Sequence, residues 1–142
     1  GAFTFSFWLK PTAWECSGVI ATDSGWRVGH DATGCGFEVY NNKMCYTYSG
    51  YGDYDQSFSE STFPSTIHTL LTMRFTGSSV IFTHGATQIY SASSTYQVTS
   101  TQLHIGSSAY ITIPMYFKDI RVYDRALTAD EISVLASNGP NP

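Results

Sequence analysis

The chain has 142 residues, seven of them basic and eleven acidic, which gives a net charge of -4. The length suits one domain, and the acidic balance argues against electrostatic binding of nucleic acid, which requires clustered lysine and arginine. Aromatic residues make up 15% of the chain and charged residues 13%, a composition that favours strands over helices, and no apolar run is long enough to span a bilayer.

The first predicted strand covers residues 3–10, in which apolar residues on one face alternate with Thr4, Ser6, Trp8 and Lys10 on the other. Strands are next expected at 18–22, 26–29, 36–40 and 43–48. The last two form a hairpin around Asn41-Asn42, in a register that places Glu38 opposite Cys45. A loop rich in Gly, Asp and Ser is expected to follow, from Ser49 to Ser65.

The second half of the chain continues with predicted strands at 69–75, 80–83, 88–91, 103–105 and 111–123. His84-Gly85 occupies the place of a tight turn, where glycine allows a positive φ. In the longest strand we expect Phe117, Ile120 and Val122 to point inward. The change of parity among these three residues predicts a bulge at Lys118-Asp119.

One helix is predicted, and it comes last. Thr128 is a good N-cap residue, and Glu131 three positions later completes a capping box. An apolar stripe of Ile132, Val134 and Leu135 follows, and Asn138-Gly139-Pro140 ends the helix. Turn signals every 8 to 14 residues, with no helix between strands, predict an all-β antiparallel sandwich with one short C-terminal helix, in a single domain covering 1–142.

The three cysteines permit at most one internal disulfide. In the predicted hairpin Cys35 points away from the face of Cys45, so Cys16 with Cys35 is the candidate pair. Three free thiols are the alternative, because free cysteine is often buried. No C-x-x-C pair is present to suggest a zinc ribbon.

Four segments of the sequence resemble laminin-G-like domains of the concanavalin A-like lectin/glucanase superfamily. The most specific is the block 116–132, Tyr-Phe-Lys-Asp-Ile-Arg-Val-Tyr-Asp-Arg-Ala-Leu-Thr-Ala-Asp-Glu-Ile, which is similar to a family strand I-D-D-V-R-I-Y followed by N-R-A-L-S-x-x-E-I. The opening Phe-Thr-Phe-Ser-Phe-Trp-Leu-Lys-Pro, the turn at 82–85 and the segment 103–106 are the others. The resemblance implies a jelly-roll β-sandwich and a location on a cell or virion surface or outside the cell.

Two departures from the family pattern stand out. The family usually has a strand before the one at residues 3–10, so the resemblance implies either a fragment or a partner, homo- or hetero-oligomeric, that completes the sheet. The family's W-H-H-V-A strand is reduced here to Ile67-His68-Thr69-Leu70-Leu71. The matched residues describe a scaffold, which predicts a fold better than an activity.

An aromatic stretch at 46–57 is the candidate ligand site. Tyrosine rings stack on sugar rings, and carboxylates accept sugar hydroxyls. The candidate residues are Tyr46, Tyr48, Tyr51, Asp53, Tyr54 and Asp55. Protein contact is an alternative use of the same composition, and covering one face of a sheet is another.

Asp53 and Asp55, together with Asp23, Asp31 or Glu60, are also candidate calcium ligands. A solvated acidic loop is the alternative, because the spacing lacks the EF-hand pattern. The superfamily's glucanases use a motif similar to E-x-D-x-x-E, and none of the four glutamates here begins one. The four histidines are widely separated, and turn or strand positions are expected for them rather than a metal site.

These observations lead to a hypothesis of a non-catalytic surface module that recognises a glycan or a protein. The alternative hypothesis is a structural subunit of a larger assembly, such as a viral capsid, a fibre or an extracellular filament. A glycan-active enzyme ranks third.

Overall fold

The computed structural model describes residues 1–12, 28–29, 36–40, 43–48, 52–57, 59–93 and 115–142, and for the strands between 28 and 56 it describes the backbone. The chain divides into two compact units. One contains Gly1–Lys10, Thr66–Thr95 and Met115–Pro142, and the other contains Pro11–Ser65 and Tyr96–Pro114. No described helix is long and apolar enough to cross a membrane.

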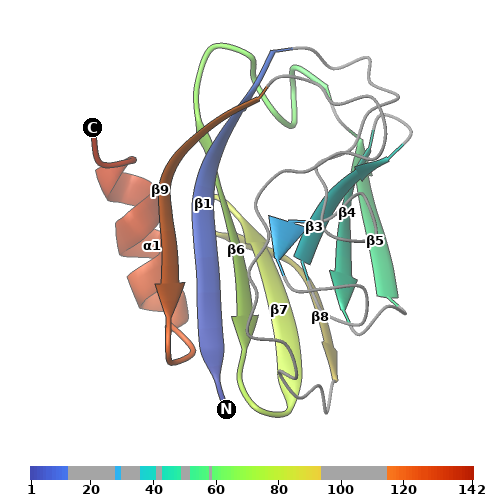
Figure 1. The fold of residues 1–142 in the computed structure, drawn as a ribbon, viewed down its shortest axis with the longest axis vertical. Coiled ribbons are helices and arrows are strands. Elements are labelled where there is room, and N and C mark those ends of the chain that lie inside the picture. The colour runs from blue at the N-terminus through green and yellow to red at the C-terminus, as the bar shows by residue number, and fades with distance from the viewer. Residues whose placement is uncertain (13–27, 30–35, 41–42, 49–51, 58, 94–114) are drawn as a thin grey trace. The chain divides into compact units, whose positions relative to one another are not determined.

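The first unit is built on a five-stranded sheet with the order β8-β7-β6-β1-β9 (Figure 1). Its strands are β1 (Phe3–Pro11), β6 (Thr69–Phe75), β7 (Ser79–His84), β8 (Thr87–Ser93) and β9 (Met115–Tyr123). The pairs β1–β6, β6–β7 and β7–β8 are antiparallel, as the sequence predicts. β1, the first strand in sequence, lies between β6 and β9, so it has a neighbour on each side.

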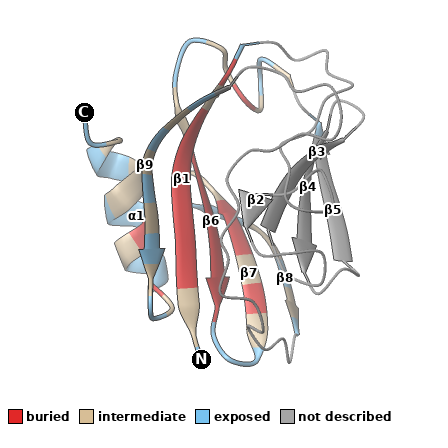
Figure 2. Ribbon diagram, in the orientation of Figure 1, coloured by how far each residue is buried: buried red, intermediate tan, exposed pale blue. Residues whose placement is uncertain are grey.

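One face of this sheet carries an aromatic and aliphatic core. Across β1 and β6, Phe5 pairs with Met73 and Phe7 with Leu71. Directly opposed residues share a face, and the core of the described residues includes these four side chains together with Leu9, Phe75, Val80 and Phe82. The buried residues concentrate on β1, β6 and β7, as Figure 2 shows. The predicted inward face of residues 3–10 and the predicted strand at 69–75 are therefore confirmed.

The opposite face is also buried, and its buried side chains are largely polar. Thr4, Ser6, Thr72, Arg74 and Thr83 are each at most 8% exposed. The hydroxyls of Thr72 and Thr83 hydrogen-bond each other across β6 and β7. Buried hydroxyls require hydrogen-bond partners of this kind. The alternating sequence pattern alone does not predict that both faces of the sheet are buried.

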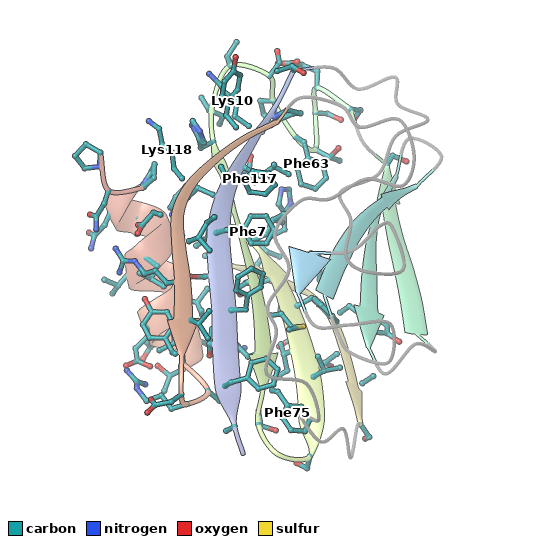
Figure 3. All side chains as sticks on the ribbon, viewed as in Figure 1. Phe7, Lys10, Phe63, Phe75, Phe117 and Lys118 are labelled. Carbon is teal, nitrogen blue, oxygen red and sulfur yellow. The ribbon has the colours of Figure 1, made fainter. Side chains whose placement is uncertain are left out.

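Asp119 interrupts the regular backbone of β9. Its φ is 49°, in the left-handed region, which is uncommon for a residue other than glycine. This irregularity lies at the predicted bulge, but the predicted change of parity is wrong. Residues 117, 119, 121 and 123 are half-buried, whereas the residues between them are exposed. Phe117 contacts Phe7, with ring centroids 5.6 Å apart (Figure 3). The prediction that Ile120 and Val122 are also buried is wrong, because they are 38% and 60% exposed on the last strand of the sheet.

Helix α1 (Ala129–Asn138) begins where the sequence predicts. The Glu131 amide donates to the Thr128 hydroxyl at 3.2 Å, and the Thr128 amide donates to the Glu131 carboxylate at 2.8 Å. These two bonds confirm the capping box. Of the predicted apolar stripe, Ile132 is fully buried, whereas Val134 is 57% exposed. The helix lies beside one face of the five-stranded sheet (Figure 1).

The second unit contains a four-stranded antiparallel sheet with the order β2-β3-β4-β5. Its strands are β2 (Val28–Gly29), β3 (Gly36–Tyr40), β4 (Lys43–Tyr48) and β5 (Gly52–Ser57). The hairpin register is confirmed, with Glu38 opposite Cys45. The prediction of a loop throughout 49–65 is wrong, because residues 52–57 form a strand paired with β4. Backbone pairing overrides the weak strand propensity of Gly, Asp and Ser.

Two further details correct the predicted hairpins. The turn between β7 and β8 is Gly85-Ala86 rather than His84-Gly85, since His84 pairs with Thr87. Gly85 does supply the positive φ, at 61°. The predicted strands at 18–22 and 103–105 and the Cys16–Cys35 pair lie outside the described residues.

Candidate functional site

Five of the six predicted ligand-contacting residues lie on two paired strands. Tyr46 and Tyr48 are on β4, and Asp53, Tyr54 and Asp55 are on β5. The register places Tyr46 opposite Tyr54 and Cys45 opposite Asp55. Tyr51 lies outside the described residues. Two strands thus bring together residues that are up to nine positions apart in the sequence.

The same register divides these positions between the two faces of the four-stranded sheet. Alternate residues of a strand, and directly opposed residues of a pair, share a face. Positions 46, 48 and 54 therefore fall on one face, and positions 53 and 55 on the other. The tyrosine face also includes Phe37 and Met44, whereas the aspartate face includes Glu38, Lys43 and Thr47. Candidate tyrosine and aspartate residues alternate along β5, which is the outermost described strand of this sheet.

The predicted calcium ligands Asp53 and Asp55 lie two positions apart on this strand. Among the side chains that the structure does describe, no three His, Cys, Asp or Glu gather in a way that suits a metal ion. His68 and His84 are described, and they occupy the residue before β6 and the last residue of β7. His30 and His104 fall outside the described residues.

A second group of polar residues, which the sequence reasoning missed, gathers on the five-stranded sheet at the end of β1. Lys10 and Lys118, labelled in Figure 3, lie on the adjacent strands β1 and β9, and both are close enough to His68 to lower its pKa. The amino group of Lys10 lies 4.9 Å from the centroid of the Tyr116 ring. The Tyr116 side chain remains 57% exposed. We call Lys10, His68, Tyr116 and Lys118 the basic cluster.

His68 joins this cluster from the other side of β1. Leu9 pairs with Thr69, and continuing this antiparallel register by one residue sets Lys10 beside His68. The pKa of His68 is lowered from its ordinary value of 6.5, first by burial and then by the positive charges of Lys118 and Lys10. Its Nε2 atom is buried and has no hydrogen-bond partner. The imidazole is therefore neutral at pH 7 and has one ring nitrogen unsatisfied.

The other described cations are already engaged. Arg121 holds Asp119 in a bidentate pair, with N···O distances of 2.7 and 2.9 Å. Arg125 holds Glu131 in the same way, at 2.7 and 2.8 Å. The Nη1 of Arg74 donates to the Leu127 carbonyl at 2.8 Å. Among the described residues, Lys10 and Lys118 are thus the cationic side chains with no carboxylate or carbonyl partner.

A shallow groove of about 350 Å³ lies between α1 and the end of β9. Its lining combines apolar side chains with three charged ones: Tyr123, Leu127, Val134, Leu135, Arg125, Asp130 and Glu131. Arg125 and Glu131 neutralise each other. The groove therefore offers few free polar groups with which to orient a ligand, and it is a weaker candidate than the two sites above.

Comparisons with known proteins agree on the fold. Residues 1–133 match the laminin-G-like family model of the concanavalin A-like lectin/glucanases superfamily. No curated protein matches the chain.

Among solved structures, one similar chain is botulinum neurotoxin type C, whose cell entry depends on interaction with two ganglioside molecules. The TM-score is 0.65 and the sequence identity is 14%, over 96% of this chain and 35% of that one. A second is the receptor binding domain of the botulinum neurotoxin C/D mosaic serotype, with a TM-score of 0.67 and 12% identity over 96% of this chain and 36% of that one.

A third is the binding domain of Paraclostridial Mosquitocidal Protein 1, with a TM-score of 0.65 and 15% identity over 96% of this chain and 37% of that one. The chain thus spans little more than a third of each of these structures. At such low identities the likeness establishes the fold. The family match over most of the length shows that this chain belongs to the concanavalin A-like lectin/glucanases superfamily and has the antiparallel β-sandwich fold, with one short C-terminal helix, that the sequence predicts.

Proposed function

We propose that this chain is a non-catalytic recognition module that binds a glycan at the edge strand β5. The observation that carries the proposal is the register of β4 and β5, which assembles tyrosines and aspartates from separate strands beside one sheet edge. Membership of a lectin-like superfamily supports it. So does the interaction of one structural neighbour, botulinum neurotoxin type C, with gangliosides.

Each candidate residue has a role that follows from its chemistry. Asp53 and Asp55 accept hydrogen bonds from sugar hydroxyls, while Tyr51 and Tyr54 supply flat faces for the apolar side of a pyranose ring. Tyr46 and Tyr48 extend the aromatic surface onto β4. Positions 53 and 55 lie on one face of β5 and position 54 on the other. A ligand bound along the edge of this strand therefore reaches residues of both faces.

The module binds without transforming its ligand. Hydrolysis of a glycosidic bond requires a pair of carboxyl groups on either side of the scissile bond. The strand motif E-x-D-x-x-E of the superfamily's glucanases is absent from the sequence, which has four glutamates in unrelated contexts. Binding at a cell or virion surface, outside the cell, is the setting that we propose for such a module.

A glycan array first identifies a glycan that binds the chain, and calorimetric titration with that glycan then tests the proposal. We expect Tyr54→Ala, Asp53→Asn and Asp55→Asn each to weaken affinity by about tenfold, the effect of losing a stacking contact or a charge-assisted hydrogen bond. Tyr40→Phe on β3 is the matched control. Unchanged affinity in all three variants would place the glycan elsewhere on the chain and refute the proposed site.

A second function is favoured by the exposed apolar residues of β9. Ile120 and Val122 are 38% and 60% exposed, and no described strand pairs with β9 on the side away from β1. An edge strand with such residues is a surface on which another chain can add a strand. The chain would then be a subunit of a larger assembly. Mass measurement in solution separates the two, because a monomer at all concentrations contradicts assembly through β9.

A further inference from the structure

We propose that the basic cluster of Lys10, His68, Tyr116 and Lys118 binds the anionic group of an acidic glycan, a sugar that carries a carboxylate or a sulfate. The inference rests on the proposed function for the class of ligand. It adds a second contact surface, on the five-stranded sheet, and a charge requirement that the β5 site does not impose.

Two neighbouring lysines of the cluster have no acidic partner in the part of the chain that the structure describes. The chain has a net charge of -4, yet Lys10 and Lys118, on adjacent strands, have no carboxylate partner among the described residues. Like charges repel, so a pair of neighbouring lysines is unfavourable unless an anion joins them. Each of the other described cationic side chains has a carboxylate or a carbonyl partner, whereas these two have neither.

His68 contributes a buried ring nitrogen to the cluster. Its buried Nε2 lacks a hydrogen-bond partner, whereas buried polar atoms are nearly always satisfied. Both lysines lie close enough to lower the pKa of the imidazole, so the three side chains form one electrostatic unit. A bound anion offsets the repulsion, accepts hydrogen bonds from the lysines and favours the protonated imidazole.

Exposed apolar surface lies beside the charged groups of the cluster. Tyr116 is 57% exposed and Ile67, the residue before His68, is 56% exposed. A ligand that fits this surface has an apolar face as well as an anionic group, and an acidic pyranose has both. An extended polyanion such as nucleic acid fits poorly, because it meets the negative charge of the rest of the chain.

Calorimetric titration of the full chain with lactose, sulfated lactose and sialyllactose tests this inference. We expect both acidic sugars to bind more tightly than lactose, and Lys118→Gln to weaken only the acidic sugars, by about tenfold. Lys118→Arg keeps the charge and should keep the affinity. Arg125→Gln makes the same change of net charge beside Thr4, at the opposite end of β1 from Lys10, and should have little effect on the affinity. Affinity for the acidic sugars should also fall as the salt concentration rises.

The outcomes separate the two proposals. If the wild type binds all three sugars equally and Lys10→Gln and Lys118→Gln change nothing, the basic cluster is refuted while glycan recognition stands. If no sugar binds, but vesicles of phosphatidylserine and phosphatidylcholine bind through Lys10 and Lys118, the cluster is a lipid-binding surface and the acidic-glycan inference is refuted. If neither the three sugars nor the vesicles bind, the acidic-glycan inference is also refuted, and retention on the oligosaccharide array decides glycan recognition separately.

Discussion

The Thr4 hydroxyl joins the first strand of the chain to Leu127, 123 residues later in the sequence. It accepts a hydrogen bond from the Leu127 amide at 2.8 Å and donates one to the Arg125 carbonyl at 2.9 Å. Thr4 is fully buried. The segment that leads into α1 is thus fixed to β1 by one side chain, and Arg74 adds a bond to the Leu127 carbonyl.

Thr4→Val should therefore destabilise the fold. Valine matches the shape of threonine, but it leaves the buried Leu127 amide and the partly buried Arg125 carbonyl without their partner. The expected loss is about 1–3 kcal/mol in the free energy of unfolding. Urea denaturation followed by tryptophan fluorescence measures it. Thr4→Ser keeps the hydroxyl and should retain much of the stability; equal losses in the two variants would show that the hydrogen bonds contribute little.

The capping box gives a prediction about pH. Hydrogen bonds from Arg125 and from the Thr128 backbone lower the pKa of Glu131 from its ordinary value of 4.5 to about 2. A lowered pKa in the folded state means that the ionised carboxylate contributes stability above pH 4.5, and that this contribution is lost as the pH falls toward 2. Asp124 and Asp130 are the other carboxylates nearby, and both remain in the variant described next.

Glu131→Gln should thus lower the urea midpoint at neutral pH, and the difference from wild type should shrink as the pH falls below 4.5. Comparing the two proteins at each pH removes the contribution of Asp119, whose pKa is also lowered, first by its hydrogen bond with Arg121. A difference that stays constant across this range would mean that the ionised form of Glu131 does not stabilise the helix.

Asp119 is suited to its left-handed backbone because its short side chain is tolerated there and also binds locally. Its carboxylate accepts hydrogen bonds from Arg121 and from the Asn141 amide at 3.2 Å. Asp119→Asn keeps the backbone preference and loses the ion pair, whereas Asp119→Val loses both. We expect the valine variant to have the lower thermal midpoint by several degrees. The same midpoint in both would show that the positive φ imposes no strain on valine.

Calcium is expected to leave the protein's stability unchanged. Asp53 and Asp55 share one face of an edge strand and offer two carboxylates, while calcium takes six to eight oxygens at short range. Thermal unfolding with millimolar calcium and with EDTA should give the same midpoint. A calcium-dependent rise that Asp53→Asn and Asp55→Asn abolish would instead identify these residues as metal ligands.

The sequence predicts the parts of this fold that depend on local patterns. The inward face of residues 3–10, the Glu38–Cys45 register and the Thr128–Glu131 capping box all follow from spacing within one or two elements, and the structure confirms them. Strand β5 was not predicted, because Gly52, Asp53 and Asp55 have low strand propensity and its stability depends on pairing with β4.

The basic cluster was missed for a related reason. Lys10, His68 and Lys118 come from three separate parts of the sequence, and only the strand order β6-β1-β9 makes them neighbours. The exposure of Ile120 and Val122 likewise depends on the place of β9 at the end of its sheet. Sequence patterns report which face of a strand a residue occupies, but they do not report where that strand lies in the sheet.

A screen of the purified chain against immobilised oligosaccharides tests the central claim most directly. It measures which glycans retain the protein and, afterwards, the mass of each glycan. The account predicts retention on a subset of the glycans, enriched in acidic ones, with every glycan mass unchanged. Retention on none of them would contradict glycan recognition, and shortened glycans would contradict a non-catalytic module.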